Sequence, residues 1–210
     1  MIRIMIADDH AMIRQGLRRV LEAEGDMKVV GEAENGQEAL IQGKKTSPDL
    51  ILLDIIMPGR DSLEIVEELK RCKPELRILM LTSHAEDQYA LRCLRAGADG
   101  YLRKTGASED LVAAIRKIHG GGKYISDKLA ELLALSLTKD STQAPHELLS
   151  NREFQVLRMI GGGQTVSEIS DELNLSVKTI STYRARILEK TQMKNNAEIM
   201  RYVLEHELGE

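Results

Sequence analysis

The sequence is poor in several residue types, and each shortage excludes a class of protein. It has no tryptophan, one phenylalanine and only 3% aromatic residues, so its cores must be built from aliphatic side chains and methionine. Its two cysteines, Cys72 and Cys93, have no metal-site spacing, and we interpret them as reduced packing thiols of a cytoplasmic protein. No apolar run approaches the roughly 18 residues that a membrane helix needs. The acids at Asp8 and Asp9 argue against an N-terminal signal peptide, so no membrane partner is expected.

Positive charge is also scarce, but it is unevenly distributed. Lys and Arg total 29 against 33 Asp and Glu, for a net charge of −4, which alone disfavours a nucleic-acid-binding protein. Residues 178–194 nevertheless contain one acid, Glu189, and several basic residues. These are Lys178, Arg184, Arg186, Lys190 and Lys194. A locally basic helix can bind nucleic acid even in an acidic protein.

Residues 1–122 alternate between strand and helix patterns. Strands are predicted at Arg3–Asp8, Lys28–Ala33, Leu50–Asp54, Arg77–Thr82 and Gly100–Leu102. Helices are predicted at Ala11–Ala23, Gly36–Lys45, Ser62–Cys72, Asp87–Ala96 and Ser108–His119, the last capped by Ser108. This alternation predicts an α/β domain, a doubly wound parallel sheet of the flavodoxin-like (βα)5 type with right-handed connections and strand order 2-1-3-4-5.

The rest of the chain shows no strand pattern. Residues 123–147 are predicted to be a linker, with a helix at Ser126–Leu137 and a flexible segment at Thr138–Glu147. Residues 148–210 are predicted to be a small all-α domain. Capping boxes begin its first two helices, at Ser150–Glu153 and Thr165–Glu168, and the first of these helices ends at Gly161–Gly163. A turn at Asn174 and Ser176 follows the second helix. Two further helices are predicted at Val177–Thr191 and Asn196–Glu207.

Two short helices joined by a tight turn, the second of them basic, are typical of a helix-turn-helix. In the second helix, Ile180, Ile187 and Thr191 fall on an inner stripe, with Val177 and Tyr183 beside it. The opposite face carries mostly small residues, which let a helix enter the major groove deeply. These are Lys178, Ser181, Thr182 and Ala185.

Acidic residues end two strands that should be neighbours in the sheet. Asp8 and Asp9 follow the first strand and Asp54 ends the third. Three carboxylates at one edge repel each other and require a cation, for which Mg²⁺ is suited because it prefers oxygen ligands. Thr82 ends the fourth strand and Lys104 follows the fifth. A carboxylate nucleophile, a metal, a hydroxyl and an ammonium together predict a phosphoryl-transfer site.

The motifs Asp8-Asp9-His10, Asp54–Gly59, Leu81-Thr82-Ser83 and Tyr101–Lys104 resemble those of a response-regulator receiver domain over residues 1–122. The resemblance implies that Asp54 accepts a phosphoryl group from a sensor histidine kinase. It further implies the roles of the surrounding residues. Asp8, Asp9, Asp54 and the Ile56 carbonyl would hold Mg²⁺, Thr82 and Lys104 would bind phosphoryl oxygens, Ser83 would fill a small-residue position, and Tyr101 would be an aromatic switch. One departure is Ser62, where the family often has glycine.

The segments Leu149–Glu153, Glu168–Ser170 and Leu175–Ile180 resemble the LuxR-type output domain of the NarL/FixJ family, and Tyr183 is similar to the GacA/UvrY-like branch. Thr191-Gln192 departs from a common Leu-Gly. The resemblance implies a transcription regulator that binds double-stranded DNA and forms a homodimer on activation. Ser181, Thr182 and Ala185 would face base edges, while Lys178, Thr179, Arg184 and Lys190 would contact phosphates.

Three alternatives to this hypothesis remain open. The first is a hydrolase with Asp54 as covalent nucleophile, but such enzymes usually carry a second Asp two residues later, where this chain has Ile56. We therefore expect no enzyme activity beyond self-dephosphorylation. The second alternative is a regulator that ignores phosphorylation and whose receiver only binds partners. The third is an output domain that binds RNA instead of DNA.

Overall fold

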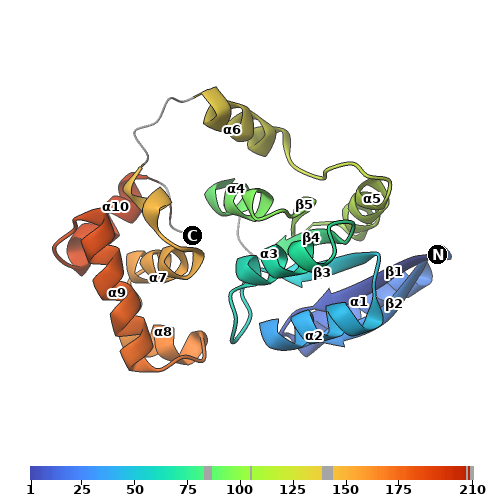
Figure 1. Cartoon of the computed structure of the whole chain (residues 1–210), viewed down its shortest axis with the longest axis horizontal. Coiled ribbons are helices and arrows are strands. Elements are labelled where there is room, and N and C mark those ends of the chain that lie inside the picture. Colours follow the sequence, from blue (N-terminus) through green and yellow to red (C-terminus); the bar gives the residue numbers. More distant parts are fainter. Residues whose placement is uncertain (83–86, 105, 139–143, 207, 209–210) are drawn as a thin grey trace. The chain divides into compact units, whose positions relative to one another are not determined.

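The computed structural model describes residues 1–82, 87–104, 106–138, 144–206 and 208, and the chain forms two compact units, Met1–Ser136 and Leu137–Glu210. Figure 1 shows the sheet of the first unit and the helices of the second. Among the described helices, none is long and apolar enough to cross a membrane.

A five-stranded parallel sheet forms the centre of the first unit, in the predicted order β2-β1-β3-β4-β5. The strands are β1 (Ile2–Ala7), β2 (Met27–Ala33), β3 (Leu50–Asp54), β4 (Arg77–Thr82) and β5 (Gly100–Arg103). The helices between and after them are α1 (Ala11–Ala23), α2 (Gly36–Thr46), α3 (Ser62–Cys72), α4 (Asp87–Arg95) and α5 (Ser108–His119). The flavodoxin-like fold prediction is therefore confirmed.

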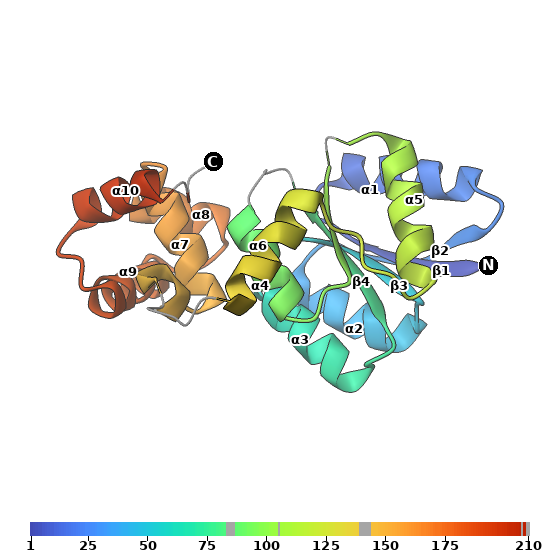
Figure 2. The same cartoon turned by 90° about the horizontal axis from the view of Figure 1, so that it is seen from above.

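Helices cover both faces of the sheet, with α1 and α5 on one side and α2 and α3 on the other (Figure 2). The core on the first side joins alternate strand residues, such as Ile4 and Leu52, to Leu21 of α1 and Ile115 of α5. Because both faces are covered, every residue of β3 is buried. The apolar run that precedes Asp54 is explained by this central position.

The predicted cap of α5 is wrong. Ser108 is the first residue of the helix, and Ala107, which has no side-chain cap hydrogen bond, occupies the N-cap. At α2 and α3 the caps follow the usual chemistry. Asn35 accepts a hydrogen bond from the Glu38 N–H at the start of α2, and Asp61 accepts two at the start of α3.

The chain continues along the edge of β5 after α5. The Tyr101 N–H donates to the Tyr124 carbonyl at 2.9 Å, and the Tyr124 N–H donates to the Asp99 carbonyl at 3.1 Å. Gly100 permits this approach, since a Cβ there would lie 2.9 Å from the Tyr124 carbonyl oxygen. The edge of β5 is therefore covered by residues that lie beyond residue 122.

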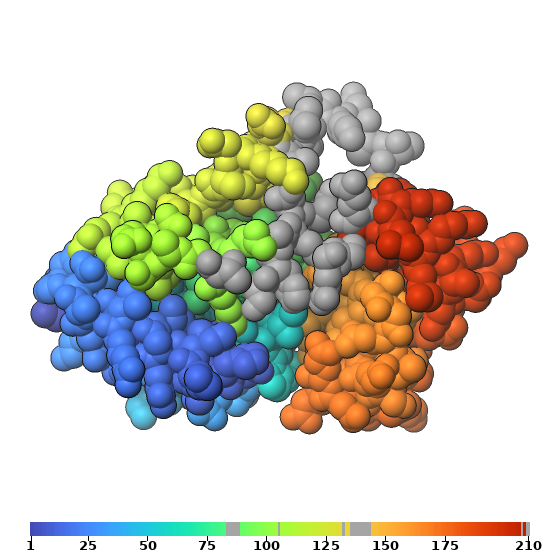
Figure 3. Space-filling view, turned by 180° about the vertical axis from the view of Figure 1, so that it is seen from behind, coloured from blue at the N-terminus to red at the C-terminus, as the bar shows by residue number. Residues whose placement is uncertain are grey.

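Helix α6 (Asp127–Thr138) then packs against the same unit, as the yellow residues beside the lime-green surface in Figure 3 show. Its Leu129 is 2% exposed and forms an apolar cluster with Ala90 and Leu91 of α4. Partly buried residues complete this cluster; they are Leu94, Tyr101, Ile125 and Leu133. The helix predicted at Ser126–Leu137 is thus confirmed, and the first compact unit extends to Ser136.

The second unit is entirely helical. Its elements are a 3-10 turn η1 (Pro145–Leu148), α7 (Asn151–Gly161), α8 (Val166–Glu172), α9 (Val177–Thr191) and α10 (Asn196–Glu205). Both predicted capping boxes are present. The flexible segment predicted at Thr138–Glu147 is wrong at its end, where η1 forms, and its residues 139–143 lie outside the described residues. The small all-α domain is confirmed.

The predicted inner stripe of α9 is confirmed in part. Ile180 and Ile187 are fully buried and Thr191 is 8% exposed. Val177, however, is 50% exposed, so its expected position beside the buried stripe is wrong. It is the first residue of α9, directly after the capping residue Ser176.

Candidate functional site

Polar side chains from several strand ends meet at the carboxyl edge of the sheet. Asp8 follows β1 and is fully buried, and Asp54 and Thr82, which end β3 and β4, are each 3% exposed. Lys104 follows β5, and its Nζ lies 2.6 Å from Asp8 Oδ2 and 2.7 Å from Asp54 Oδ2. Since parallel strands end at one edge, the sequence could predict this convergence.

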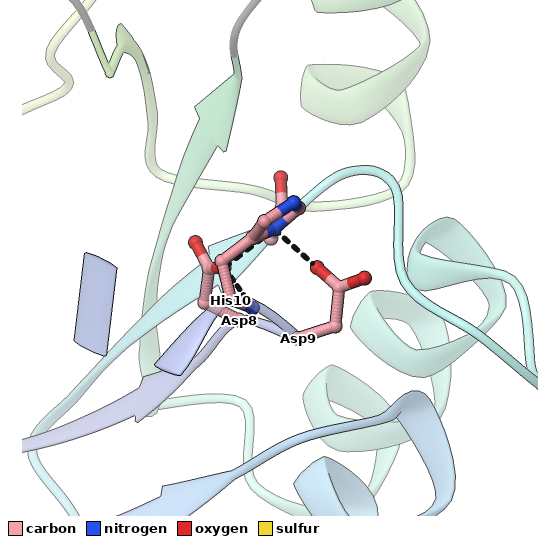
Figure 4. Close-up of side chains that lie close together, drawn as sticks. Asp8, Asp9 and His10 are labelled. Carbon is pink, nitrogen blue, oxygen red and sulfur yellow. Dashed lines mark hydrogen bonds and ion pairs between the residues drawn. The ribbon is translucent and has the colours of Figure 1, made fainter. Parts of the chain in front are cut away.

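His10 joins the acidic cluster, although the sequence suggested no role for it beyond its place in the motif. Its backbone N–H donates to Asp8 Oδ1 at 2.9 Å, and its Nδ1 lies 2.8 Å from Asp9 Oδ1 (Figure 4). The imidazole is 64% exposed. The backbone contact fixes the turn after β1, and the ring lies against the carboxylate of Asp9.

Burial and charge shift the pKa values of the central pair. The pKa of Asp54 is raised to about 6, chiefly by burial and to a smaller degree by the charges of Asp8 and Asp9, against the attraction of Lys104. Burial by itself lowers the pKa of Lys104, but the carboxylates of Asp54 and Asp8 outweigh this effect and raise it overall. Lys104 therefore stays protonated at neutral pH, and most of Asp54 is ionised.

The residues present fit a divalent cation. Ligand atoms from Asp8, Asp9, His10 and Asp54 all lie within 4.8 Å of one another. Three carboxylates face one ammonium group, that of Lys104, so the described residues leave an excess of negative charge in a largely buried place. Carboxylate oxygens are the ligands that Mg²⁺ prefers, and an ion of two positive charges would neutralise the excess.

Tyr101 lies half-buried on β5, in the apolar cluster with Leu91 of α4 and Leu129 of α6. The backbone N–H of Lys104 donates to the Thr82 carbonyl at 2.6 Å, which ties the end of β5 to the end of β4. The predicted small-residue position, Ser83, lies outside the described residues. The region around Tyr101 thus lies between α6 and the acidic edge of the sheet, and it contacts α6 through the apolar cluster.

The α9 residues that are predicted to contact DNA fall into two groups, which differ in exposure and in their contacts within the unit. Lys178, Ser181, Thr182 and Ala185 are exposed on one face. The remaining three residues contact neighbouring groups of their own unit. Thr179 Oγ1 lies 2.8 Å from Ser176 Oγ, Arg184 Nε donates to Asn196 Oδ1 at 2.6 Å, and Lys190 Nζ lies 2.6 Å from Glu153 Oε2.

Both units match known families. Residues 4–116 match the response regulator receiver domain, and residues 147–203 match the bacterial regulatory proteins of the luxR family. The chain is a response regulator. It is 39% identical over 209 residues to the response regulator UvrY of Escherichia coli strain K12, covering 99% of this chain and 96% of that protein. It is equally 39% identical over 206 residues to the response regulator GacA of Pseudomonas protegens, covering 98% of this chain and 97% of that protein.

Solved structures of similar response regulators share the fold. RcsB of Salmonella typhimurium is 29% identical, with a TM-score of 0.68 over 97% of each chain. A second RcsB structure, bound to promoter rprA in the presence of the phosphomimetic BeF3⁻, is 28% identical, with a TM-score of 0.65 over 97% of this chain and 98% of that one. This response regulator therefore has a receiver domain followed by a LuxR-type DNA-binding domain.

Ser62, at a position where the family often has glycine, contacts the backbone next to the acidic site. The side chain is 1% exposed, and its Oγ lies 2.8 Å from the carbonyl oxygens of both Asp54 and Ile55. The single hydroxyl hydrogen is shared between these two acceptors. The hydroxyl thus ties the start of α3 to the backbone that carries Asp54. The sequence identified the departure but gave no indication of this contact.

Proposed function

We propose that a sensor histidine kinase transfers a phosphoryl group to Asp54 and that this modification controls sequence-specific binding of the LuxR-type domain to double-stranded DNA. The observation that carries the proposal is the position of Lys104 Nζ, within 2.7 Å of both Asp8 and Asp54 at a buried sheet edge. An ammonium group at this position can pair with the Asp54 carboxylate before phosphorylation and with an oxygen of the phosphoryl group after it. DNA binding also favours a cytoplasmic location.

In the proposed transfer, an oxygen of Asp54 attacks the phosphorus of a phosphohistidine on the kinase. The new O–P bond forms as the N–P bond breaks, the bonding electrons stay on the ring nitrogen, and the imidazole, which already carries a proton on its other nitrogen, leaves as a neutral group. Lys104 moves its ion pair from Asp54 to a phosphoryl oxygen, and the Thr82 hydroxyl donates to another. Mg²⁺, held by Asp8, Asp9, Asp54 and the Ile56 carbonyl, would supply charge neutralisation.

The proposed output is a change in the DNA-bound state of the second unit. Support for the readout comes from the exposed face of α9 and from the similarity to RcsB, whose structure was solved on promoter DNA. We propose that the phosphorylated receiver favours a homodimer, as a two-state switch biased by the new charge at Asp54. Tyr101 is the proposed switch residue, because it lies in the cluster between β5 and α6.

Labelling tests the phosphoacceptor directly. The full chain is incubated with acetyl phosphate and Mg²⁺, and intact-mass analysis should show the addition of one phosphoryl group that is stable in acid and released by base. The variant Asp54→Asn keeps the size of the side chain and should not be labelled. Labelling of this variant would exclude Asp54 as the acceptor.

Two further outcomes separate the alternatives. Continuous hydrolysis of small phosphate esters, rather than a single labelling event, would favour a hydrolase. An oligomeric state and a DNA affinity that are both unchanged by beryllofluoride would favour a regulator that does not respond to phosphorylation. Competition between duplex DNA and RNA of the same sequence identifies the nucleic acid that the second unit prefers.

A further inference from the structure

Between Val177 and Ala185, the exposed face of α9 carries little hydrogen-bonding capacity. Val177, Ser181 and Ala185 follow one another at i, i+4 and i+8, and Lys178 and Thr182 lie beside them. All five are exposed, Val177 to 50%. Lys178 is the only one of the five with a side-chain nitrogen, so the paired donor and acceptor groups of Asn, Gln or Arg that distinguish adenine and guanine are absent from this part of the helix.

Several hydroxyl groups near the start of α9 are already used within the helix. Thr182 Oγ1 donates to the Lys178 carbonyl at 2.9 Å, which leaves the methyl group of Thr182 and the oxygen lone pairs as the groups it can offer to a ligand. Ser176 Oγ accepts from the Thr179 N–H at 3.1 Å and lies 2.8 Å from Thr179 Oγ1. These hydroxyls cap the helix and are poorly placed to serve as specific donors to bases.

We propose that α9 recognises thymine through its 5-methyl group, and that Val177, Thr182 and Ala185 provide the apolar contacts. The inference rests on the proposed function, since it assumes that α9 enters the major groove of duplex DNA. In that groove the thymine methyl is the one apolar group that a base pair presents, and alanine and threonine methyls pack against it. Val177 adds the largest apolar surface, at the N-terminal end where a recognition helix approaches base edges.

This assignment explains why a half-exposed valine stands at the first position of the helix. Single exposed apolar residues are common on protein surfaces, but here the valine lies on the same face as the residues that would contact bases. A single methyl–methyl contact removes little area from water, so each contact should contribute about fourfold in affinity. Recognition by several such contacts gives moderate specificity from a helix face that has only one long polar side chain, Lys178, between Val177 and Ala185.

The test uses the full chain and a duplex selected from random sequences. Each thymine of the half-site is replaced in turn by deoxyuridine, which removes only the 5-methyl group and keeps every hydrogen-bonding atom. We expect two or three positions at which affinity falls about fourfold per contact. Affinity unchanged by uridine at every thymine, or a selected half-site without thymine, would overturn the inference. If no duplex is bound at all, the proposed function itself fails, and this result is seen before any base is replaced.

Matched variants connect each methyl to its partner. Thr182→Ser removes one methyl and keeps the hydroxyl that donates to the Lys178 carbonyl. Val177→Ala removes two methyl groups from an exposed position. Each variant should bind the thymine duplex more weakly and should lose sensitivity to uridine at one position only, which a double-mutant cycle measures as coupling.

The control is Met200→Ala, which truncates an apolar side chain on α10 that is 39% exposed. It should leave every uridine effect intact. Circular dichroism confirms that the variants fold, so that a loss of binding can be assigned to the contact. Uridine effects that persist unchanged in both Thr182→Ser and Val177→Ala would show that other residues contact the methyl groups.

Discussion

The two functional surfaces of this response regulator are built in opposite ways. At the receiver site, charged groups are buried and paired, with Lys104 9% exposed between the nearly inaccessible Asp8 and Asp54. On α9, the residues that would face base edges, Ser181, Thr182 and Ala185, are exposed, small and uncharged. The buried site therefore has its geometry fixed before a phosphoryl group arrives, whereas the α9 face gains most of its interactions only when DNA covers it. Substitutions at the receiver site should accordingly affect folding, whereas substitutions on the α9 face should affect DNA binding.

The largest effect is expected for Lys104→Met. Removal of the ammonium leaves Asp8 and Asp54 buried without their cation, and the free energy of unfolding should fall by about 3 kcal/mol. Urea denaturation without divalent ions measures the change. The matched control is Arg116→Gln, which removes a surface ion pair with Asp26 and should have a much smaller effect. Equal effects of the two substitutions would contradict the contrast between buried and exposed charges.

A second test uses the pH dependence of Asp99, which is 2% exposed. Burial alone would raise its pKa, but Lys70 at 2.6 Å, the Ile78 N–H and Lys123 lower it overall. A lowered folded-state pKa stabilises the protein above the unfolded pKa of about 3.9, and this contribution is lost as the pH falls through the folded-state value. Asp99→Asn should cost about 2 kcal/mol at pH 7 and progressively less toward pH 3, as measured by denaturation at each pH.

A third prediction separates two lysines of α9. Lys178 is exposed, and Lys178→Ala should flatten the slope of log affinity against log salt by about one if it contacts a phosphate. Lys190 is paired with Glu153, whose side chain is 3% exposed, and Lys190→Met should lower the stability of the second unit by about 1–2 kcal/mol. Fluorescence anisotropy over a salt series, together with denaturation, distinguishes the two outcomes. A larger slope change for Lys190→Met than for Lys178→Ala would reverse the assignment.

The smallest effect is expected for Ser62→Ala, which removes the hydroxyl shared by the Asp54 and Ile55 carbonyls. The loss should be about 1 kcal/mol, with faster hydrogen exchange in the backbone after β3. Ser167→Ala, on α8, removes an exposed hydroxyl and provides the control. An unchanged stability and unchanged exchange in Ser62→Ala would show that the contact is incidental.

The sequence predicted the sheet and the receiver site well for a simple physical reason. Hydrophobic periodicity and caps determine where elements begin and end, and α1, α3, β4 and α9 have the predicted bounds. Once the strand order is known, parallel strands bring Asp8, Asp54 and Lys104 to one edge without further information.

Contacts between helices were much less predictable. The ion pair of Lys190 with Glu153 and the hydrogen bond of Arg184 with Asn196 depend on how α9 packs against α7 and α10. The exposure of Val177 has the same origin, since periodicity assigns a residue to a stripe but does not say where a neighbouring helix stops. For α5, the pattern predicted the bounds Ser108–His119 correctly but assigned the N-cap to Ser108, whereas Ala107 occupies it.

The strip of chain around Tyr124 that borders β5 has a practical consequence for isolated receivers. A fragment that stops at residue 122 would expose the outer hydrogen-bonding groups of β5 and uncover Leu91, which α6 otherwise shields. Open strand edges and apolar patches promote association between copies. Dimers of such a fragment would result from the truncation and not from phosphorylation. A fragment that ends at Ser136 keeps this edge of the sheet covered.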